Sequence, residues 1–172
     1  MRMKFFAIAA LGAFATACAS TPPVQQETAP IAQPQVQPQA DPYRPSGPIA
    51  GSVQDFVQNA GDRVFYGYDR HDLTPEARET LRHQAAWLAS YSGTRILIAG
   101  NCDERGTREY NLALGARRAN AARDYLISQG VDPSRISTVS YGKERPTCRE
   151  SGEACWAVNR NATTAITGGY TN

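Results

Sequence analysis

Residues 100–119, GNCDERGTREYNLALGARRA, join the end of an apolar strand to the first half of a long helix. The strand, Arg95–Ala99, contains Ile96-Leu97-Ile98 and ends at the first glycine of the stretch. Thr107 is a good N-cap for a helix from Arg108 to Gln129, and Gly130 stops it. Small residues should form the packing face of this helix: Ala113, Ala116, Ala119, Ala122 and Leu126.

A second helix is predicted upstream of this stretch. Thr74 is suited to the N-cap, Pro75 to the first helical position, and Glu76 to the positive end of the helix dipole. Ser92-Gly93 ends the helix. Its expected core positions follow helical spacing: Ala77, Leu81, Ala85 and Leu88.

The remaining elements are short and alternate in type. We expect strands at residues 64–66, 136–141 and 162–167, and a short helix near residues 154–159. Strands that alternate with helices, without internal repeats, predict one α/β (α+β) two-layer sandwich. Its mixed sheet should carry the helices on one face.

The loop between the apolar strand and the long helix combines opposite charges. Asp103 lies beside a helix N-terminus, where unpaired N–H groups favour an anionic ligand group. Within the helix, Asn111 and Arg118 are seven residues apart and share a face, with Leu114 between them. Asp103 and Arg118 could therefore form a paired positive and negative binding site. A purely structural salt bridge between them is the alternative.

The N-terminus has the composition of an export signal. Residues 1–17 begin with Arg2 and Lys4 and continue with an uncharged, mostly apolar segment, which at about thirteen residues is too short to span a membrane. The small residues before Cys18 resemble a bacterial lipobox, in which the cysteine is lipidated. By the same resemblance, Ala19 implies sorting to the outer membrane. The alternative is an ordinary secretory signal, with Cys18 incidental.

Residues 18–51 are predicted to form an extended tether. Proline and glutamine dominate residues 19–48, and such a segment cannot bury enough apolar surface to order itself. In polyproline II geometry about thirty residues reach at most about 90 Å. The folded domain should then comprise residues 52–172.

The charge balance argues against a nucleic-acid partner. The chain has 18 basic and 16 acidic residues, and two of the basic ones lie in the predicted signal. The mature chain would be almost neutral, without a basic run.

The four cysteines are expected to have different roles. In an oxidising compartment, Cys148 and Cys155 should form a disulfide that closes a short loop. Cys102 lacks a neighbouring base, so we expect a packing residue rather than a nucleophile. The two histidines, His71 and His83, lack metal-ligand spacing with the cysteines, and no metal or cofactor is expected.

Several ordered blocks resemble the OmpA-like peptidoglycan-binding domain family. These blocks are Val64–Asp69, Asp103–Thr107, Arg118–Ala121, Val139–Pro146 and Asn159-Arg160. The resemblance covers about residues 60–167 and implies the βαβαβ arrangement of that family. Within the family, the second, third, fourth and fifth blocks are particularly similar to the lipoproteins of Tol–Pal systems, and the first resembles the opening strand and loop of the family.

The resemblance implies a ligand, the meso-diaminopimelate residue of the peptidoglycan stem peptide. Asp103 would accept from its ammonium group, and Arg118 would fork onto its carboxylate. The other contacts implied by the family are Tyr68, Asp69, Asn111 and Leu114. Of these, Asn111 is expected either to touch the ligand or to support the loop.

The chain also departs from the family pattern. Asn101 and Cys102 stand where many members have His and then Ala or Thr, and Asn161 stands where Arg is usual. We therefore expect the side chains of Asn101 and Cys102 not to make the contacts that this pair makes in other members. We also expect the C-terminal edge of the domain to differ from the family pattern.

The resemblance implies binding rather than catalysis. A cell-wall hydrolase, the enzymatic alternative, needs a metal cluster or tuned carboxylates, and no Ser/His/Asp or Cys/His arrangement is visible. Membership implies a partner, the periplasmic propeller protein of the Tol system, and a role in envelope constriction at division. Wall and partner binding would compete near Asp103. Another wall-binding lipoprotein outside Tol–Pal is the remaining alternative.

Overall fold

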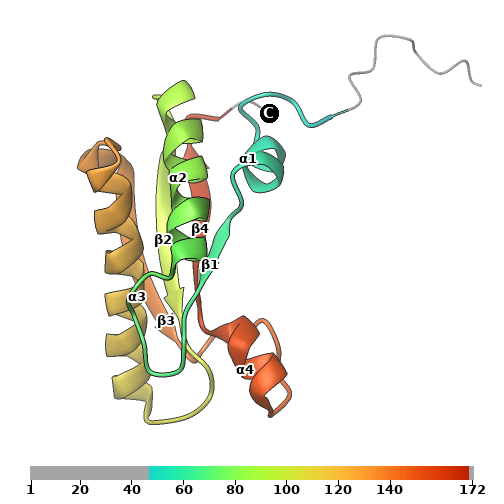
Figure 1. Ribbon diagram of the computed structural model, residues 1–172, viewed down its shortest axis with the longest axis vertical. Helices are drawn as coiled ribbons and strands as arrows, with labels where there is room; N and C mark the ends of the chain where they lie inside the picture. Colours follow the sequence, from blue (N-terminus) through green and yellow to red (C-terminus); the bar gives the residue numbers. More distant parts are fainter. Residues whose placement is uncertain (1–46, 171–172) are drawn as a thin grey trace, which may run out of the picture. The chain divides into compact units, whose positions relative to one another are not determined.

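The computed structural model describes residues 47–170. The longest helices lie in front of the sheet, and shorter helices lie toward its ends (Figure 1). In chain order the elements are α1 (Val53–Asn59), β1 (Arg63–Phe65), α2 (Pro75–Ser90), β2 (Arg95–Asn101), α3 (Arg108–Ser128), the 3₁₀ helix η1 (Pro133–Arg135), β3 (Ile136–Gly142), α4 (Glu153–Asn159) and β4 (Asn161–Gly168). The predicted signal, lipidation site and most of the tether lie outside the described residues.

Within residues 47–170, the sheet has four strands in the order β1-β4-β2-β3. β2 and β3 are parallel and are connected by α3, whereas β4 runs antiparallel to both β1 and β2. The last strand of the chain therefore lies in the middle of the sheet. This mixed sheet, with α2 and α3 on one face, confirms the predicted fold class.

Both long helices begin where the sequence predicts. The hydroxyl oxygens of Thr74 and Thr107 accept from backbone N–H groups three residues ahead, as N-caps do. The predicted core positions of α2 are all buried: Ala77, Leu81, Ala85 and Leu88. No helix within residues 47–170 is both long and apolar enough to cross a membrane.

The predicted packing face of α3 is partly wrong. Ala113 is exposed and Ala116 only half-buried, while Ala119, Ala122 and Leu126 are buried as expected. A spacing of three falls about 60° short of a full turn in an α-helix, so a row of alanines at that spacing drifts off the face. The N-terminal half of α3 instead buries Asn111, Leu114, Gly115 and Arg118.

Two glycines bring α3 directly against β2. A Cβ atom at Gly100 would lie 1.8 Å from the carbonyl oxygen of Gly115, so a side chain at this position is incompatible with the close approach of α3 to β2. The contact lies just before the loop that carries Asp103. It therefore fixes that loop relative to the buried face of α3.

Helix α1 and the 3₁₀ helix were not predicted. α1 buries Phe56, whose ring lies edge-on to Trp87 with centroids 5.0 Å apart. Asp55 accepts from the backbone N–H of Gly51 and from the indole Nε1 of Trp87, both at 2.9 Å. The backbone hydrogen bond from Gly51, more than any other contact, lowers the pKa of Asp55. The seven residues of α1 bury only Asp55 and Phe56, so they present no apolar periodic pattern that could be detected from sequence.

Candidate functional site

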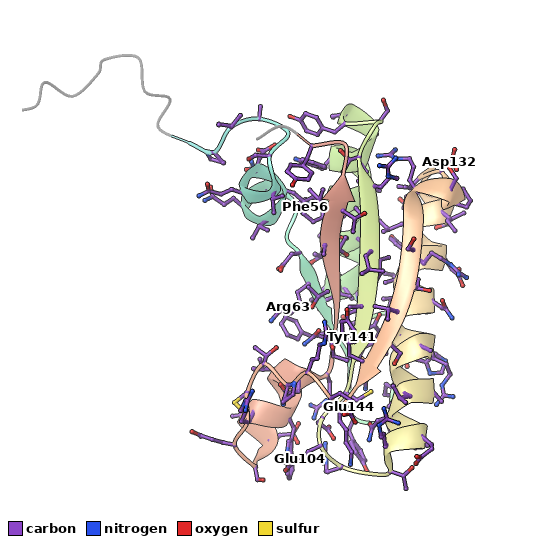
Figure 2. The ribbon with its side chains drawn as sticks, turned by 180° about the vertical axis from the view of Figure 1, so that it is seen from behind. Phe56, Arg63, Glu104, Asp132, Tyr141 and Glu144 are labelled. Carbon is purple, nitrogen blue, oxygen red and sulfur yellow. A yellow bond between two sulfur atoms is a disulfide. The ribbon has the colours of Figure 1, made fainter. Side chains whose placement is uncertain are left out.

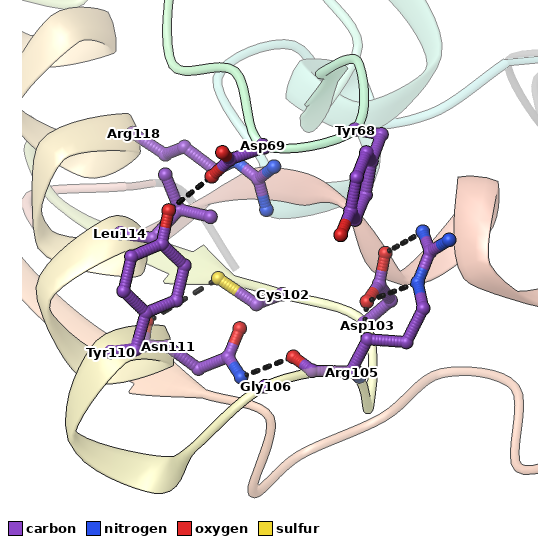
Figure 3. Close-up of a pocket in the computed structure, with 10 residues that line it drawn as sticks. All are labelled: Tyr68, Asp69, Cys102, Asp103, Arg105, Gly106, Tyr110, Asn111, Leu114 and Arg118. Carbon is purple, nitrogen blue, oxygen red and sulfur yellow. Dashed lines mark hydrogen bonds and ion pairs between the residues drawn. The ribbon is translucent and has the colours of Figure 1, made fainter.

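A cavity of about 160 Å³ lies where the β1–α2 loop, the β2–α3 loop and the start of α3 meet (Figure 3). It is lined by Tyr68, Asp69, Cys102, Asp103, Arg105, Gly106, Tyr110, Asn111, Leu114 and Arg118. All six residues that the sequence analysis assigned to binding are in this set. Loops from distant parts of the chain therefore bring the candidate ligand residues together.

Asp103 lies in the cavity wall with a side chain that is almost fully buried. Its carboxylate accepts from the Nη2 of Arg105 at 2.6 Å, from the Nε of Arg105 at 3.1 Å and from the Nη1 of Arg160 at 3.4 Å. Burial raises the pKa of Asp103, but the hydrogen bonds from Arg105 and Arg160 offset it and hold that pKa below its ordinary value. The carboxylate is therefore ionised at neutral pH.

Arg118 is fully buried and bonds to backbone rather than to a carboxylate. Its Nε donates to the carbonyl of Arg70 at 2.8 Å, its Nη2 to that of Gly67 at 3.1 Å, and its Nη1 to that of Asn101 at 2.8 Å. Burial lowers the pKa of the guanidinium.

No ion pair joins Asp103 to Arg118 among the described residues, so the salt-bridge alternative is wrong. The reason is local. The carbonyls of the β1–α2 loop point toward Arg118, while Arg105 and Arg160 occupy the oxygens of Asp103. Both charged groups nevertheless line the same cavity, one on either side.

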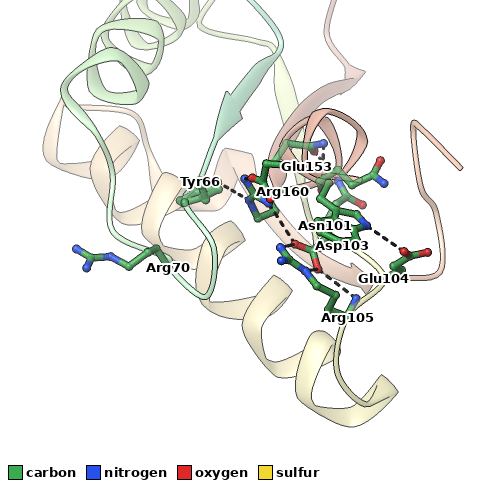
Figure 4. Close-up of polar contacts among 12 residues, drawn as sticks. Tyr66, Arg70, Asn101, Asp103, Glu104, Arg105, Glu153 and Arg160 are labelled. Carbon is green, nitrogen blue, oxygen red and sulfur yellow. Dashed lines mark hydrogen bonds and ion pairs between the residues drawn. The ribbon is translucent and has the colours of Figure 1, made fainter. Parts of the chain in front are cut away.

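Sequence reasoning missed Arg105, which covers Asp103. Its guanidinium carbon lies 4.1 Å from the ring centroid of Tyr68 and 4.1 Å from that of Trp156, within cation–π range of both. Glu104 accepts from the Nε1 of Trp156 at 2.9 Å and from the hydroxyl of Ser151 at 2.7 Å (Figure 4). The sequence did contain a signal for this pair, because a basic residue follows Asp103 by only two positions.

Arg160 connects the site to the rest of the fold. It is buried and donates to the carbonyl of Tyr66 at 3.1 Å and to Glu153 at 2.6 Å, besides its contact with Asp103 (Figure 4). The hydroxyl of Tyr66 donates to the carbonyl of Arg118 at 2.8 Å. One polar network therefore joins the end of β1, the start of α4 and both charged residues of the cavity.

The β1–α2 loop contributes Tyr68 and Asp69 to the cavity wall. Tyr68 is 62% exposed, and Asp69 has a φ of 55°, a left-handed conformation that Asp tolerates better than most residues. The carboxylate of Asp69 accepts from the hydroxyl of Tyr110, a second residue that the sequence analysis missed. Leu114 is buried and adds an apolar wall.

Asn111 supports the loop that carries Asp103. Its amide donates to the carbonyl of Arg105 at 2.7 Å and to that of Thr107 at 3.0 Å. From the other side, the Nζ of Lys143 donates to the carbonyls of Glu104 and Gly106, at 3.1 and 2.6 Å. Two side chains from different elements thus hold the backbone of one short loop.

The cysteines are arranged as follows. Cys148 and Cys155 are joined by a disulfide that closes the loop before α4. Cys102 is buried, its thiol donates to the carbonyl of Asn111 at 3.4 Å, and burial raises its pKa. A thiol that stays protonated is a poor nucleophile, which suits a packing role. Within residues 47–170, no group of three or more potential metal ligands is present.

The two asparagines that depart from the family pattern bond to each other. The Nδ2 of Asn101 donates to the Oδ1 of Asn161 at 2.8 Å, and both residues are buried. The altered positions therefore satisfy one another between β2 and β4, outside the cavity.

A family profile, related sequences and a solved structure all show similarity of this chain to the same group of proteins. The sequence profile of the OmpA family matches residues 65–160. The chain is 53% identical over 118 residues to the peptidoglycan-associated lipoprotein of Mesorhizobium japonicum, covering 69% of this chain and 70% of that one. It is 48% identical over 116 residues to that of Pseudomonas aeruginosa, covering 67% and 68%. The crystal structure of the peptidoglycan-associated lipoprotein from Burkholderia pseudomallei aligns with a TM-score of 0.60 and 40% identity, covering 62% of this chain and 90% of that chain.

Proposed function

Because the chain belongs to the OmpA family and, within it, to the peptidoglycan-associated lipoproteins, we propose that it is a non-catalytic lipoprotein whose folded domain binds peptidoglycan. The observation that carries this proposal is the cavity in which an ionised Asp103 and a buried Arg118 face a common space. A site with one negative and one positive wall suits a ligand that has both charges.

The proposed ligand group is the zwitterionic end of meso-diaminopimelate. A cavity of about 150 Å³ holds a benzene molecule, or about six non-hydrogen atoms. The free end of diaminopimelate has six non-hydrogen atoms: the carbon of its stereocentre, the ammonium nitrogen, three carboxylate atoms and the adjacent methylene carbon. It is therefore of this size. The cavity of about 160 Å³ is therefore large enough for this end but not for a sugar ring with its peptide.

Asp103 and Arg118 would divide the two charges. The ammonium would bind the carboxylate of Asp103, which is ionised at neutral pH. The ligand carboxylate would approach the Arg118 guanidinium, which uses three N–H groups for backbone carbonyls and has five in total. Tyr68, Asp69 and Leu114 would complete the walls, while Asn111 orients the loop.

Arg105 must give way for the ammonium to reach Asp103. Both carboxylate oxygens accept from its guanidinium, so a ligand cation has to replace at least one of these bonds. Until then Arg105 neutralises a nearly buried carboxylate that would otherwise be costly to leave unpaired. Ligand binding is thus an exchange of one cation for another at Asp103.

We propose no hydrolytic activity at this site. A glycosidase needs a carboxylic acid whose pKa is raised so that it can donate a proton. The pKa of Asp103 is held low instead, and Asp69, the other carboxylate of the cavity, accepts from Tyr110. Asp103 is therefore not suited to act as a general acid.

Anchoring would come from the N-terminus. Lipidated Cys18 would insert in the outer membrane, facing the periplasm, and several acyl chains make such anchoring stable. The tether before residue 52 would let the domain reach the wall. In a Tol–Pal system the periplasmic propeller protein would be the protein partner, and the link would support envelope integrity and constriction at division.

Sedimentation with isolated peptidoglycan tests the wall-binding proposal. Asp103→Asn should leave the protein in the supernatant, because a neutral amide cannot hold the ammonium. Asp124→Asn, which removes an exposed carboxylate on the outside of α3, should sediment like the unaltered protein. Normal sedimentation of Asp103→Asn would refute this site.

A further inference from the structure

The face of the sheet opposite α2 and α3 has no helix over its centre in the described part of the chain (Figure 2). A pocket of about 330 Å³ lies on this face, within the size range of ligand pockets. It is lined by Arg63, Leu97, Ala99, Asn101, Tyr141, Arg145, Thr147, Thr163 and Ala165. The lining residues on the strands alternate with the core residues, so they belong to the other face, and Arg145 and Thr147 follow the end of β3.

The bare face carries arginines, and its strands supply no acidic side chains. None of the four strands contains Asp or Glu. Arg63 and Arg145 line the pocket, and neither takes part in an ion pair or a side-chain hydrogen bond with any described residue. The face is therefore complementary to negative charge.

Arg63 gives an independent indication of a missing acceptor. Its Nε is shielded from solvent and has no hydrogen-bond partner, the only side-chain atom in this condition within residues 47–170. A buried donor without a partner is costly, and a bound ligand or water is the usual explanation.

Arg145 is oriented on the other side of the pocket. Its guanidinium carbon lies 3.7 Å from the ring centroid of Tyr141, so the two groups stack. Stacking restricts the side chain and leaves the edge of its guanidinium free to donate. The pocket floor between the two arginines is apolar, with Leu97, Ala99 and Ala165.

We propose that this face is a docking surface for an extended acidic segment of another protein. Carboxylates of that segment would bind Arg63 and Arg145, and an apolar side chain between them would cover Leu97 and Ala165. A second copy of this chain would bring like charges together, and a lipid surface would require apolar side chains that protrude beyond the arginines. This inference is independent of the proposed wall binding, which uses the cavity between the β1–α2 loop, the β2–α3 loop and the start of α3.

The docking surface adjoins the candidate site through one residue. The side chain of Asn101 lines this pocket, while its backbone carbonyl accepts from Arg118 in the other cavity. The two ligands could therefore bind the same molecule from opposite faces of β2.

Fluorescence anisotropy of a labelled peptide with alternating Glu and Leu, titrated with the full chain, tests the docking surface. The probe should bind at least about tenfold more tightly than the same peptide with Lys for Glu, because charge-assisted pairs are the strong ones. The double variant Arg63→Gln/Arg145→Gln should weaken binding at least about tenfold. The matched variant Arg82→Gln/Arg123→Gln removes two charges from the helical layer and should stay within about twofold.

Equal loss in both double variants, or no loss in the first, would overturn the proposal. So would arginine-dependent binding to phosphatidylglycerol vesicles without peptide binding, or self-association that the first double variant abolishes. Arg145 is exposed, so Arg145→Gln alone should fold even if the double variant does not. This single variant should weaken peptide binding several-fold, and unchanged binding would count against the docking surface.

Discussion

The guanidinium of Arg105 forks onto the carboxylate of Asp103, with Nη2 2.6 Å from Oδ2 and Nε 3.1 Å from Oδ1. The rings of Tyr68 and Trp156 both lie within cation–π range of this guanidinium. The cation is thus held at the position proposed for the ligand ammonium. The site is occupied by its own chain before any ligand binds.

Replacement of Arg105 should therefore strengthen ligand binding. In Arg105→Gln the ammonium no longer competes with a guanidinium for Asp103, so we expect the affinity for a diaminopimelate muropeptide to rise about threefold to tenfold. Isothermal titration calorimetry measures this change. Arg123→Gln, which removes a half-buried arginine of α3 that pairs with Asp124, is the control and should leave the affinity unchanged. A lower affinity of Arg105→Gln for the muropeptide would mean that Arg105 itself binds the ligand.

Arg118 should be a stability determinant as well as a ligand residue. Arg118→Met leaves the carbonyls of Gly67, Arg70 and Asn101 without their donor, and we expect the free energy of unfolding to fall by about 3 kcal/mol. Urea unfolding followed by circular dichroism tests this. The neighbouring and exposed Arg117→Met should change stability by less than about 0.5 kcal/mol. Equal stability of the two variants would contradict the assigned role.

The contact between Gly100 and Gly115 should not tolerate a methyl group. Gly100→Ala places Cβ against the backbone of α3, and we expect a loss of at least about 3 kcal/mol or no folded protein. Gly93→Ala is the matched control, since a Cβ at Gly93 meets nothing within 4 Å and its φ is not positive. Thermal unfolding distinguishes the two, and a stable Gly100→Ala would show that β2 and α3 are further apart.

Asp103 should make the stability depend on pH. Its pKa in the folded state is below the ordinary 3.8, so its ionised form stabilises the fold above that value, and this contribution is lost as the pH falls through the lower folded pKa. Asp103→Asn lacks the contribution at every pH. The two proteins should therefore differ more in urea unfolding at pH 7 than near pH 2. A constant difference over this range would contradict the lowered pKa.

Much of the fold followed from local chemistry in the sequence. The caps at Thr74 and Thr107 and the apolar run Ile96-Leu97-Ile98 locate the two long helices and the central strand. The prediction of the α3 packing face was partly wrong because it relied on small residues alone. Asn111 and Arg118 are buried on this face because their side chains form hydrogen bonds, not because they are apolar.

The members of the site were predictable, but their pairing was not. The six assigned residues line one cavity, yet Asp103 binds Arg105 and Arg160 instead of facing Arg118 alone. Arg160 follows Asp103 by 57 positions and reaches it only because β4 returns to the centre of the sheet. Such a choice among competing arginines depends on tertiary packing, which spacing along the chain does not encode.

The central claim is that the cavity recognises both charges at the end of diaminopimelate. The most direct test is a calorimetric titration with two muropeptides that differ only in the third residue of the stem, meso-diaminopimelate or lysine. Lysine keeps the ammonium but lacks the second carboxylate, so its muropeptide should bind at least about tenfold more weakly, the equivalent of one charge-assisted hydrogen bond. Equal affinity for the two muropeptides would contradict recognition of the zwitterion by Asp103 and Arg118.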